Sequence, residues 1–199
     1  MVIRAFGRDQ LIACADPWVM AYDPAQGREI WRARCLGGEA VPSPGFAGGI
    51  VLVGSVDGQL AAIRADGQGD VTSTHVLWAQ EEHLPAICSP VSNGKLVFNV
   101  DSAGILVCYD LHSGRKLWEK DLDANFQASP ILVGGYLYLL SDRGTWWIFE
   151  AAAQCKVVGK AEFNEECQAS PAFQSSHLYL RTKSRLYCLA PTSPSPAQP

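Results

Sequence analysis

The sequence predicts an all-β protein made of four-stranded antiparallel β-propeller blades, about four and a half of them. Three observations support this prediction: a repeat of about 40 residues, short apolar runs between Gly/Asp/Ser turns, and a tryptophan at nearly the same position of each of the first three repeats. No stretch of ten residues keeps the periodicity of a helix. The repeat therefore decides the fold class.

The dipeptide Ser-Pro marks the repeat, at successive steps of 46, 40 and 41 residues. A turn glycine follows each of the first three serines by 15 residues, and a tryptophan precedes each of them by 11 or 12. Three landmarks that stay in phase indicate an array of similar units. We take as structural anchors Ser43, Pro44, Ser89, Pro90, Ser129, Pro130, Ser170 and Pro171, with Gly58, Gly104, Gly144, Trp31, Trp78 and Trp118.

Each Ser-Pro is followed by two apolar runs that a tight turn separates, such as GKLVFNV and ILVCYD. Runs rich in β-branched and aromatic residues between such turns are typical of hairpin strands. The sequence before the first Ser-Pro has a similar pair, LIACAD and VMAYD. We therefore expect blades at residues 2–42, 43–88, 89–128 and 129–169, a half-blade of two strands at 170–190, and a disordered Pro/Ser tail at 191–199.

Two segments share a turn motif before the tryptophan, YDPAQGREIW at 22–31 and YDLHSGRKLW at 109–118. Asp23 and Asp110 can hold the turn by accepting backbone N–H bonds, and Gly27 and Gly114 can supply a positive φ. The tryptophan that follows is large enough to fill the space between blades. In the fourth unit Gly159 stands near the expected tryptophan, so its anchor is degenerate.

The pattern D-x-x-x-G-x-x-x-W, followed by Ser-Pro and an aromatic strand, resembles the pyrroloquinoline quinone (PQQ)-like β-propeller repeat family. That family includes quinoprotein dehydrogenases and the non-enzymatic propeller lipoprotein of bacterial outer-membrane assembly. The segments at 69–78 and 169–189 resemble its uncharacterised exported bacterial branch. The resemblance implies a seven- or eight-bladed propeller of which this chain is the C-terminal part; the alternative is a compact ring of four or five blades. Upstream blades or a second copy would then close the ring.

Composition excludes several classes of partner. The chain has 16 Lys+Arg against 20 Asp+Glu and no run of basic residues, which argues against nucleic-acid binding. No apolar run approaches the roughly 18 residues of a membrane span. The resemblance implies the periplasm or the cell surface, whereas a true start at Met1 would place the chain in the cytoplasm.

The sequence predicts no catalytic, cofactor or metal site. One acidic residue recurs at the turn between the second and third strands of successive blades, where aspartate is a common turn residue; the alternative is an acidic rim for a cation such as calcium. The pair Trp146-Trp147 is aromatic, but neighbouring residues of a strand face opposite sides, so at most one could stack on a quinone. The recurring acids are Asp16, Asp57, Asp101 and Asp142.

The seven cysteines show no adjacent pair and no CxxC, so we expect buried packing roles, including for Cys108 and Cys188 in their matching contexts LVCYD and LYCLA. The favoured function is a non-catalytic scaffold or binding module without a cofactor, whose partner is a protein or a carbohydrate. The alternative is part of a PQQ-dependent dehydrogenase whose ligands for PQQ and calcium lie outside this chain.

Overall fold

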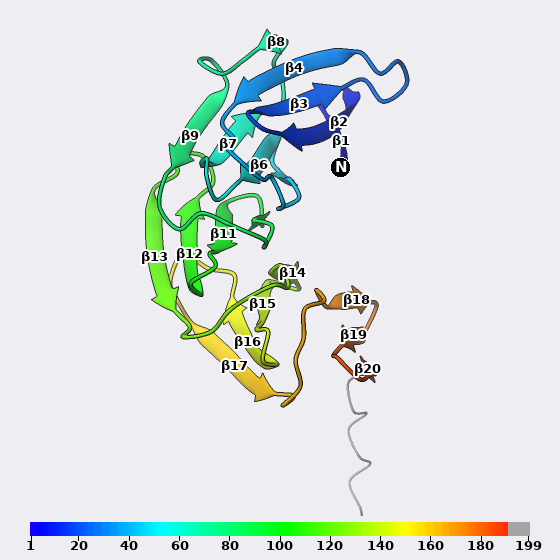
Figure 1. Cartoon of the computed structure of the whole chain (residues 1–199), viewed down its shortest axis with the longest axis vertical. Helices are drawn as coiled ribbons and strands as arrows, with labels where there is room; N and C mark the ends of the chain where they lie inside the picture. Colours follow the sequence, from blue (N-terminus) through cyan, green and yellow to red (C-terminus); the bar gives the residue numbers. More distant parts are fainter. Residues whose placement is uncertain (191–199) are drawn as a thin grey trace, which may run out of the picture.

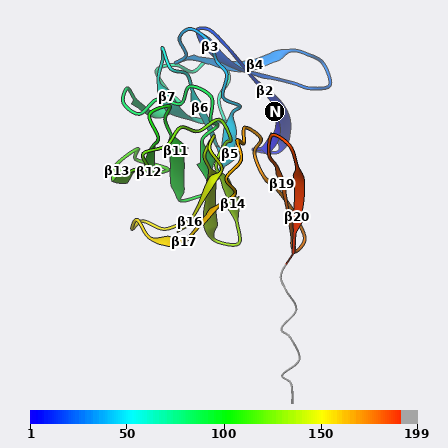
Figure 2. The same ribbon diagram turned by 60° about the horizontal axis from the view of Figure 1, so that its bottom comes forward.

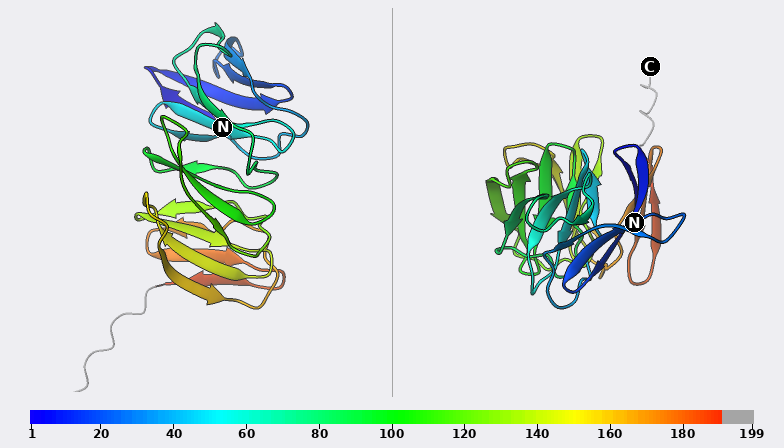
Figure 3. Two further views of the ribbon diagram at one scale, coloured as in Figure 1. Left: turned by 90° about the vertical axis from the view of Figure 1, so that its left-hand side faces the viewer. Right: turned by 90° about the horizontal axis from the view of Figure 1, so that it is seen from above.

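The computed structural model describes residues 1–190, which form five β-sheets arranged one after another along an open arc (Figure 1). Figure 3 shows the sheets stacked in sequence order, from blue to orange. The described residues contain no helix long and apolar enough to cross a membrane. The predicted all-β class and the propeller blades are confirmed, whereas the tail expected at 191–199 lies outside the described residues.

The first four blades each have four antiparallel strands, which run in chain order from the inside of the arc to its outside (Figure 1). Blades 1 and 2 consist of β1 (Val2–Ala5), β2 (Arg8–Ala15), β3 (Trp18–Tyr22) and β4 (Glu29–Arg34), then β5 (Gly45–Ala47), β6 (Ile50–Gly54), β7 (Leu60–Arg64) and β9 (Val76–Gln80). Blades 3 and 4 consist of β10 (Val91–Ser92), β11 (Leu96–Val100), β12 (Ile105–Asp110) and β13 (Lys116–Asp121), then β14 (Ile131–Val133), β15 (Tyr136–Leu140), β16 (Thr145–Glu150) and β17 (Val157–Glu162).

Blade 5 has three strands where the sequence suggested two: β18 (Ala172–Gln174), β19 (His177–Arg181) and β20 (Leu186–Leu189). The additional strand, β18, is only three residues long, too short to stand out as an apolar run. It forms because Phe173 packs into the core between blades 4 and 5 while its backbone pairs with β19. No strand among the described residues pairs with the outer edge of β20.

The insertion in the second repeat forms a strand that belongs to the first blade. β8 (Gly69–Asp70) runs parallel to β4, with Trp31 opposite Gly69. The N–H of Val71 donates to the carbonyl of Arg32 at 2.8 Å, and Val71 is buried. The insertion therefore covers the outer edge of blade 1, which would otherwise expose unpaired backbone groups.

A β-bulge lies at the same point between the third and fourth strands of blades 1 to 4. The residue opposite the third strand just before the bulge is the repeat tryptophan in the first three blades and glycine in the fourth. The pairs are Trp31 with Ala21, Trp78 with Ala62, Trp118 with Cys108, and Gly159 with Ile148. Gly159 thus occupies the tryptophan position, as its place in the repeat suggested.

The tryptophans join each blade to the next by a hydrogen bond from the indole. Trp78 Nε1 donates to the carbonyl of Leu111 at 2.8 Å, and Trp118 Nε1 donates to that of Ala152 at 3.1 Å. Trp31 reaches blade 2 through Gln10: its Nε1 donates to Gln10 Oε1 at 2.8 Å, and Gln10 Nε2 donates to the carbonyl of Ala65 at 2.9 Å. Each of the first three boundaries therefore combines apolar burial with a hydrogen-bonded indole donor.

The Ser-Pro serines form a second connection between blades, just before each blade's innermost strand. The N–H of Ser43 donates to the hydroxyl of Ser89 at 2.9 Å, the N–H of Ser89 to that of Ser129 at 2.9 Å, and the N–H of Ser129 to that of Ser170 at 3.0 Å. We call these three hydrogen bonds the serine ladder. The spacing of the Ser-Pro dipeptides is thus the spacing of the blades.

Candidate binding face

Antiparallel strand order divides the loops of every blade between two ends. The turn between the second and third strands lies at the same end as the link from the fourth strand to the next blade. We call the surface formed there the turn face, which comprises the turns at 16–17, 55–59, 101–104, 141–144 and 182–185 and the links at 35–44, 81–90, 122–130 and 163–171. The opposite face carries the remaining hairpin turns, including those with Asp23 and Gly27 and with Asp110 and Gly114.

Backbone hydrogen bonds hold the links at 35–44, 122–130 and 163–171 against turns. The N–H of Asp142 donates to the carbonyl of Asn125 at 2.9 Å, and the carbonyl of Asp142 accepts from Cys167 N–H at 2.8 Å. At Gly104 the turn approaches the link so closely that a Cβ would lie 2.0 Å from the carbonyl oxygen of Ala124. The structure places Gly58, Gly104 and Gly144 in three of these turns, so these sequence anchors belong to the turn face.

The turn face is hollowed at four blade boundaries, always where the link into a blade meets the turn of that blade. The hollows between blades 1 and 2, 3 and 4, and 4 and 5 have volumes of about 490, 620 and 280 Å3. The one between blades 2 and 3 is almost closed, at about 10 Å3. The larger three are of the size that admits side chains or small ligands.

The largest hollow, between blades 3 and 4, is lined by charges of both signs. Asp121 ends β13 and Asp123 lies in the link, whereas Arg143 and Lys160 come from blade 4. The ammonium of Lys160 lies 5.5 Å from the ring centre of Trp147, within the range of a cation–π contact. This arrangement can accept an acidic and a basic group side by side.

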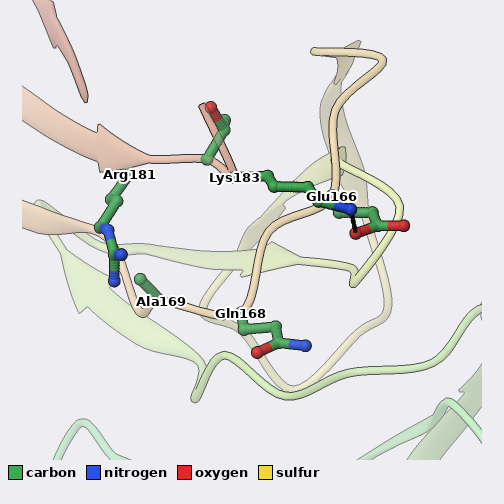
Figure 4. A pocket seen from close by; sticks show the side chains of 6 residues that line it. Glu166, Gln168, Ala169, Arg181 and Lys183 are labelled. Carbon is green, nitrogen blue, oxygen red and sulfur yellow. Dashed lines mark hydrogen bonds and ion pairs between the residues drawn. The ribbon is translucent and has the colours of Figure 1, made fainter. Parts of the chain in front are cut away.

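Figure 4 shows the hollow between blades 4 and 5, which is lined by Gln168 and Ala169 of the link and by Arg181 at the end of β19. Lys183 Nζ pairs with Glu166 Oε2 at 2.8 Å, and this contact lowers the pKa of the Glu166 carboxyl. The hydroxyl of Thr182 donates to Glu165 Oε2 at 2.5 Å and likewise lowers the pKa of the Glu165 carboxyl. The two glutamates thus stay ionised and tie the link to the turn.

A polar cluster around His83 was not foreseen from the sequence. His83 Nδ1 lies 3.0 Å from Asp101 Oδ2, and Nε2 lies 3.5 Å from Glu119 Oε2. Asn99 Nδ2 donates to the backbone carbonyl of His83 at 2.6 Å, and His83 has φ of 52°. The cluster joins residues 16 to 36 positions apart in the chain, so no local pattern could have shown it.

The recurring aspartates lie in the turns that the sequence indicated. The Asp101 side chain serves its turn: Oδ1 accepts from Ile105 N–H at 2.9 Å, while Oδ2 faces His83. Residues 1–190 contain no group of three His, Cys, Asp or Glu side chains arranged to hold a metal ion.

The tryptophan pair of β16 serves packing in and around blade 4. Trp146 and Trp147 both lie between blades, on opposite faces of β16: Trp147 packs on Phe126 with ring centres 5.7 Å apart, and Trp146 packs on Tyr138 at 5.6 Å. Both rings are thus occupied in blade packing. All seven cysteines are free thiols, and no two are adjacent in the sequence.

Burial differs among the cysteines. Cys35 and Cys108 are buried, and loss of solvation raises the pKa of each thiol to about 12. Cys188, expected to be buried like Cys108, is exposed. The expectation for Cys188 was wrong because no blade or strand among the described residues covers its side of β20.

Comparison with known proteins agrees with this architecture. The family model described as "Outer membrane protein assembly factor BamB" matches residues 3–86 and 69–153, which together span more than half of the chain. Comparison with curated proteins finds no match.

Solved structures support the fold alone, because identities are low. BamB from Moraxella catarrhalis superposes with a TM-score of 0.72 at 18% identity, over 94% of this chain and 55% of that one. The computationally designed Ika8 protein gives 0.67 at 14% identity, over 90% and 57%. BBS1N in complex with ARL6DN gives 0.67 at 16% identity, over 98% and 62%.

This chain spans a little over half of the BamB structure. Its repeat landmarks, its blades and the family match agree with one another. The chain belongs to the PQQ-like β-propeller repeat family, in the group described as outer membrane protein assembly factor BamB.

Proposed function

We propose that this chain is a non-catalytic scaffold that binds a protein partner through its turn face. The observation that carries the proposal is the recurrence of hollows at one position in three of the four blade boundaries, with volumes of about 490, 620 and 280 Å3. A row of separate hollows suits the successive side chains of a protein better than a single small ligand. Propellers offer such loop surfaces on a rigid frame.

The charges that line the hollows support a polypeptide partner. Arg34 and Glu81 border the hollow between blades 1 and 2, and Asp123 and Arg143 border the hollow between blades 3 and 4. A surface that carries charges of both signs favours a partner with complementary charges of both signs and opposes a uniformly charged polymer. The proposed partner is therefore a folded or extended protein segment that carries both acidic and basic side chains.

The family supports a setting for this role. Its description names an outer-membrane protein assembly factor. By extension we place this chain on the periplasmic side of the outer membrane, in contact with a protein of the assembly machinery. A carbohydrate partner, the other class considered from the sequence, has no comparable support.

Photo-cross-linking tests the proposal in cells. The cross-linker p-benzoylphenylalanine replaces Arg143 or Glu81 on the turn face and, as matched controls, Ala25 or Ser113 on the opposite face; all four side chains are exposed. We expect the two turn-face variants to capture a protein of outer-membrane assembly and the controls to capture none. Equal capture from both faces, or capture from the controls alone, would refute the proposal.

A further inference from the structure

Three apolar side chains are exposed on the turn face at blade 2. Val41 is 54% exposed, Val56 46% and Ile87 42%. Val41 belongs to the link into blade 2, Val56 to the turn between β6 and β7, and Ile87 to the link into blade 3. Figures 1 and 2 both place β6 and β7 between blade 1 and blade 3, so the three segments meet inside the array. We call these three side chains the blade-2 patch.

The turn that carries Val56 is held by the links on both sides of it. The N–H of Gly37, in the link into blade 2, donates to the Oγ of the fully buried Ser55 at 3.0 Å. On the other side, a Cβ on Gly54 would lie 2.5 Å from Pro85 Cγ, in the link into blade 3. Val56, which follows Ser55, therefore lies between the two links.

The serine ladder aligns the other two side chains of the blade-2 patch. The N–H of Ser43 donates to the hydroxyl of Ser89 at 2.9 Å, which brings the two links together. Val41 precedes Ser43 by two residues, and Ile87 precedes Ser89 by two. The two side chains thus occupy equivalent positions of neighbouring links.

The repeat does not require apolar residues at these positions. Two residues before the serines of the next two links stand exposed glutamines, Gln127 and Gln168. Two residues before the turn glycine, blades 3 and 4 have Ser102 and Asp142 where blade 2 has Val56. The exposed apolar side chains are therefore particular to this part of the turn face. Exposed apolar side chains that gather on a surface commonly mark a site of protein interaction.

The segments that carry the blade-2 patch are acidic. The links at 35–44 and 81–90 and the turn at 55–59 contain no lysine or arginine. None of their acidic side chains, all exposed, forms an ion pair with a lysine or arginine of residues 1–190. By contrast, Glu166 of the last link pairs with Lys183 at 2.8 Å. We call the unpaired acids the acidic rim, which consists of Glu39, Asp57, Glu81 and Glu82.

The blade-2 patch and the acidic rim together define what can bind there. An apolar centre with a polar rim is the usual anatomy of a protein interface, and charges across an interface are complementary. We infer that the blade-2 patch binds a segment of the partner protein in which apolar side chains stand beside lysine or arginine. A second copy of this chain does not suit the site, because it would set acidic rim against acidic rim.

The inference rests on the proposed function, because it concerns the same turn face. It adds which part of the partner reaches blade 2: an apolar and basic segment. The hollow between blades 3 and 4, with charges of both signs, remains for other side chains of the same partner.

Photo-cross-linking from a distant position separates the inference from the proposed function. The cross-linker p-benzoylphenylalanine at Arg143, in the turn of blade 4, reports capture of the partner, while Val56→Ser or Glu82→Lys changes the site at blade 2. The matched controls are Val157→Ser and Glu29→Lys, whose side chains are exposed at the opposite face.

We expect each change at blade 2 to lower the yield of cross-linked partner by about threefold or more, and the controls to keep the yield. Capture that is the same with and without the changes at blade 2 would overturn the inference and leave the proposed function standing. Absence of capture from the parent chain would overturn both.

Binding of defined peptides gives an independent answer. The probes are fluorescently labelled peptides in which leucine alternates with lysine, leucine with glutamate, or serine with lysine. By anisotropy, the full chain should bind the leucine–lysine peptide at least about tenfold more tightly than either of the others, because only this peptide matches both the apolar centre and the acidic rim. Equal binding of the leucine–lysine and serine–lysine peptides would show charge attraction alone and overturn the inference.

Charge reversal in the protein provides the matched variant. Glu39→Lys combined with Glu82→Lys neutralises the acidic rim as a whole, so the variant should lose the preference for leucine–lysine over leucine–glutamate. Asp9→Lys combined with Glu29→Lys makes the same change of net charge at the opposite face and should keep the preference. Loss of the preference in both variants, or in neither, would overturn the inference.

Sedimentation velocity tests the other occupant. Val56→Ser combined with Ile87→Ser should weaken binding of the leucine–lysine peptide and leave the sedimentation coefficient of the full chain unchanged. Self-association of the parent chain that this double change abolishes would assign the blade-2 patch to a second copy and overturn the inference.

Discussion

Single residues set the contact between neighbouring blades. Trp31 is fully buried, and its indole nitrogen donates to Gln10, itself fully buried, which donates in turn to the carbonyl of Ala65 in blade 2. In later blades the tryptophan reaches the neighbour directly. Gln10 therefore bridges the Trp31 indole and the Ala65 carbonyl, so that both buried polar groups are hydrogen-bonded. Removal of any of the three groups would leave a buried partner without a hydrogen bond.

Two substitutions of Trp31 separate the contribution of its packing from that of its hydrogen bond. Trp31→Ala should lower the free energy of unfolding by about 3–5 kcal/mol, because it leaves a large cavity. Trp31→Phe keeps most of the packing but leaves Gln10 Oε1 without a donor, at a cost of about 1–3 kcal/mol. Urea denaturation of the two variants measures both values, and a loss below about 1 kcal/mol for Trp31→Ala would contradict the packing role.

Buried thiols make the fold sensitive to alkali. Burial raises the pKa of Cys35 and of Cys108 from 9.0 to about 12. Between pH 9 and about 12 the unfolded chain loses thiol protons that the folded chain keeps, so stability falls as pH rises, by up to about 1.4 kcal/mol per pH unit for each thiol. We expect Cys35→Ala to flatten this slope in urea titrations, whereas Cys188→Ala, at an exposed site, should leave it nearly unchanged. Equal slopes for both would contradict the assignment.

At the scale of elements, the same turn motif meets different surroundings in different blades. Gly27 and Gly114 both follow an aspartate by four residues and have φ of 67° and 68°. A Cβ on Gly27 would meet nothing within 4 Å, whereas on Gly114 it would lie 2.5 Å from Trp78 Cγ. The hairpin of blade 3 thus packs against the tryptophan of blade 2.

This pair provides a matched test of packing between blades. Both Gly27→Ala and Gly114→Ala meet the same left-handed strain, about 1–2 kcal/mol. Only Gly114→Ala also displaces Trp78, which should cost about 1–3 kcal/mol more. Thermal unfolding should therefore give a clearly lower Tm for Gly114→Ala, and indole fluorescence should change in that variant alone. Equal Tm values would contradict the close contact.

The strands with long apolar runs could be predicted because their residue types and turns carry local information. β18, with three residues, and β8, with two, could not, since each is too short to stand out as an apolar run; β18 forms by pairing with β19, and β8 by pairing with the distant β4. The candidate binding face likewise has parts that the sequence could predict and parts that it could not. The turn positions of the aspartates follow from the repeat of about 40 residues. The hollows and the His83 cluster depend instead on how each link packs against the turns, which no local sequence pattern records.

At the scale of the whole molecule, the array is a row of blades in which each contacts its neighbours along the chain. The boundary of blades 4 and 5 lacks the indole hydrogen bond, because Gly159 stands at the tryptophan position. It relies instead on aromatic contacts such as Tyr138 with Phe173, whose ring centres are 4.8 Å apart. Stability in such arrays is a sum over units and boundaries, so the weakest boundary opens first.

Hydrogen exchange should show this gradient. We expect the amides of β19 to exchange at least about tenfold faster than those of β11, which occupies the same position in blade 3, under native conditions. The amides of β11 should exchange more slowly because blade 3 is covered by a neighbouring blade on each side. Equal protection of the two strands would mean that the array opens as a single unit.

The serine ladder has a direction, since every rung runs from a backbone N–H to the hydroxyl of the following serine. Among residues 1–190, Ser43 at one end offers a hydroxyl without a donor, and Ser170 at the other offers an N–H without an acceptor. Like the two ends of a polar filament, these ends are complementary only head to tail. A two-fold symmetric pairing would set donor against donor or acceptor against acceptor, so any further blade that joins the ladder must keep its polarity.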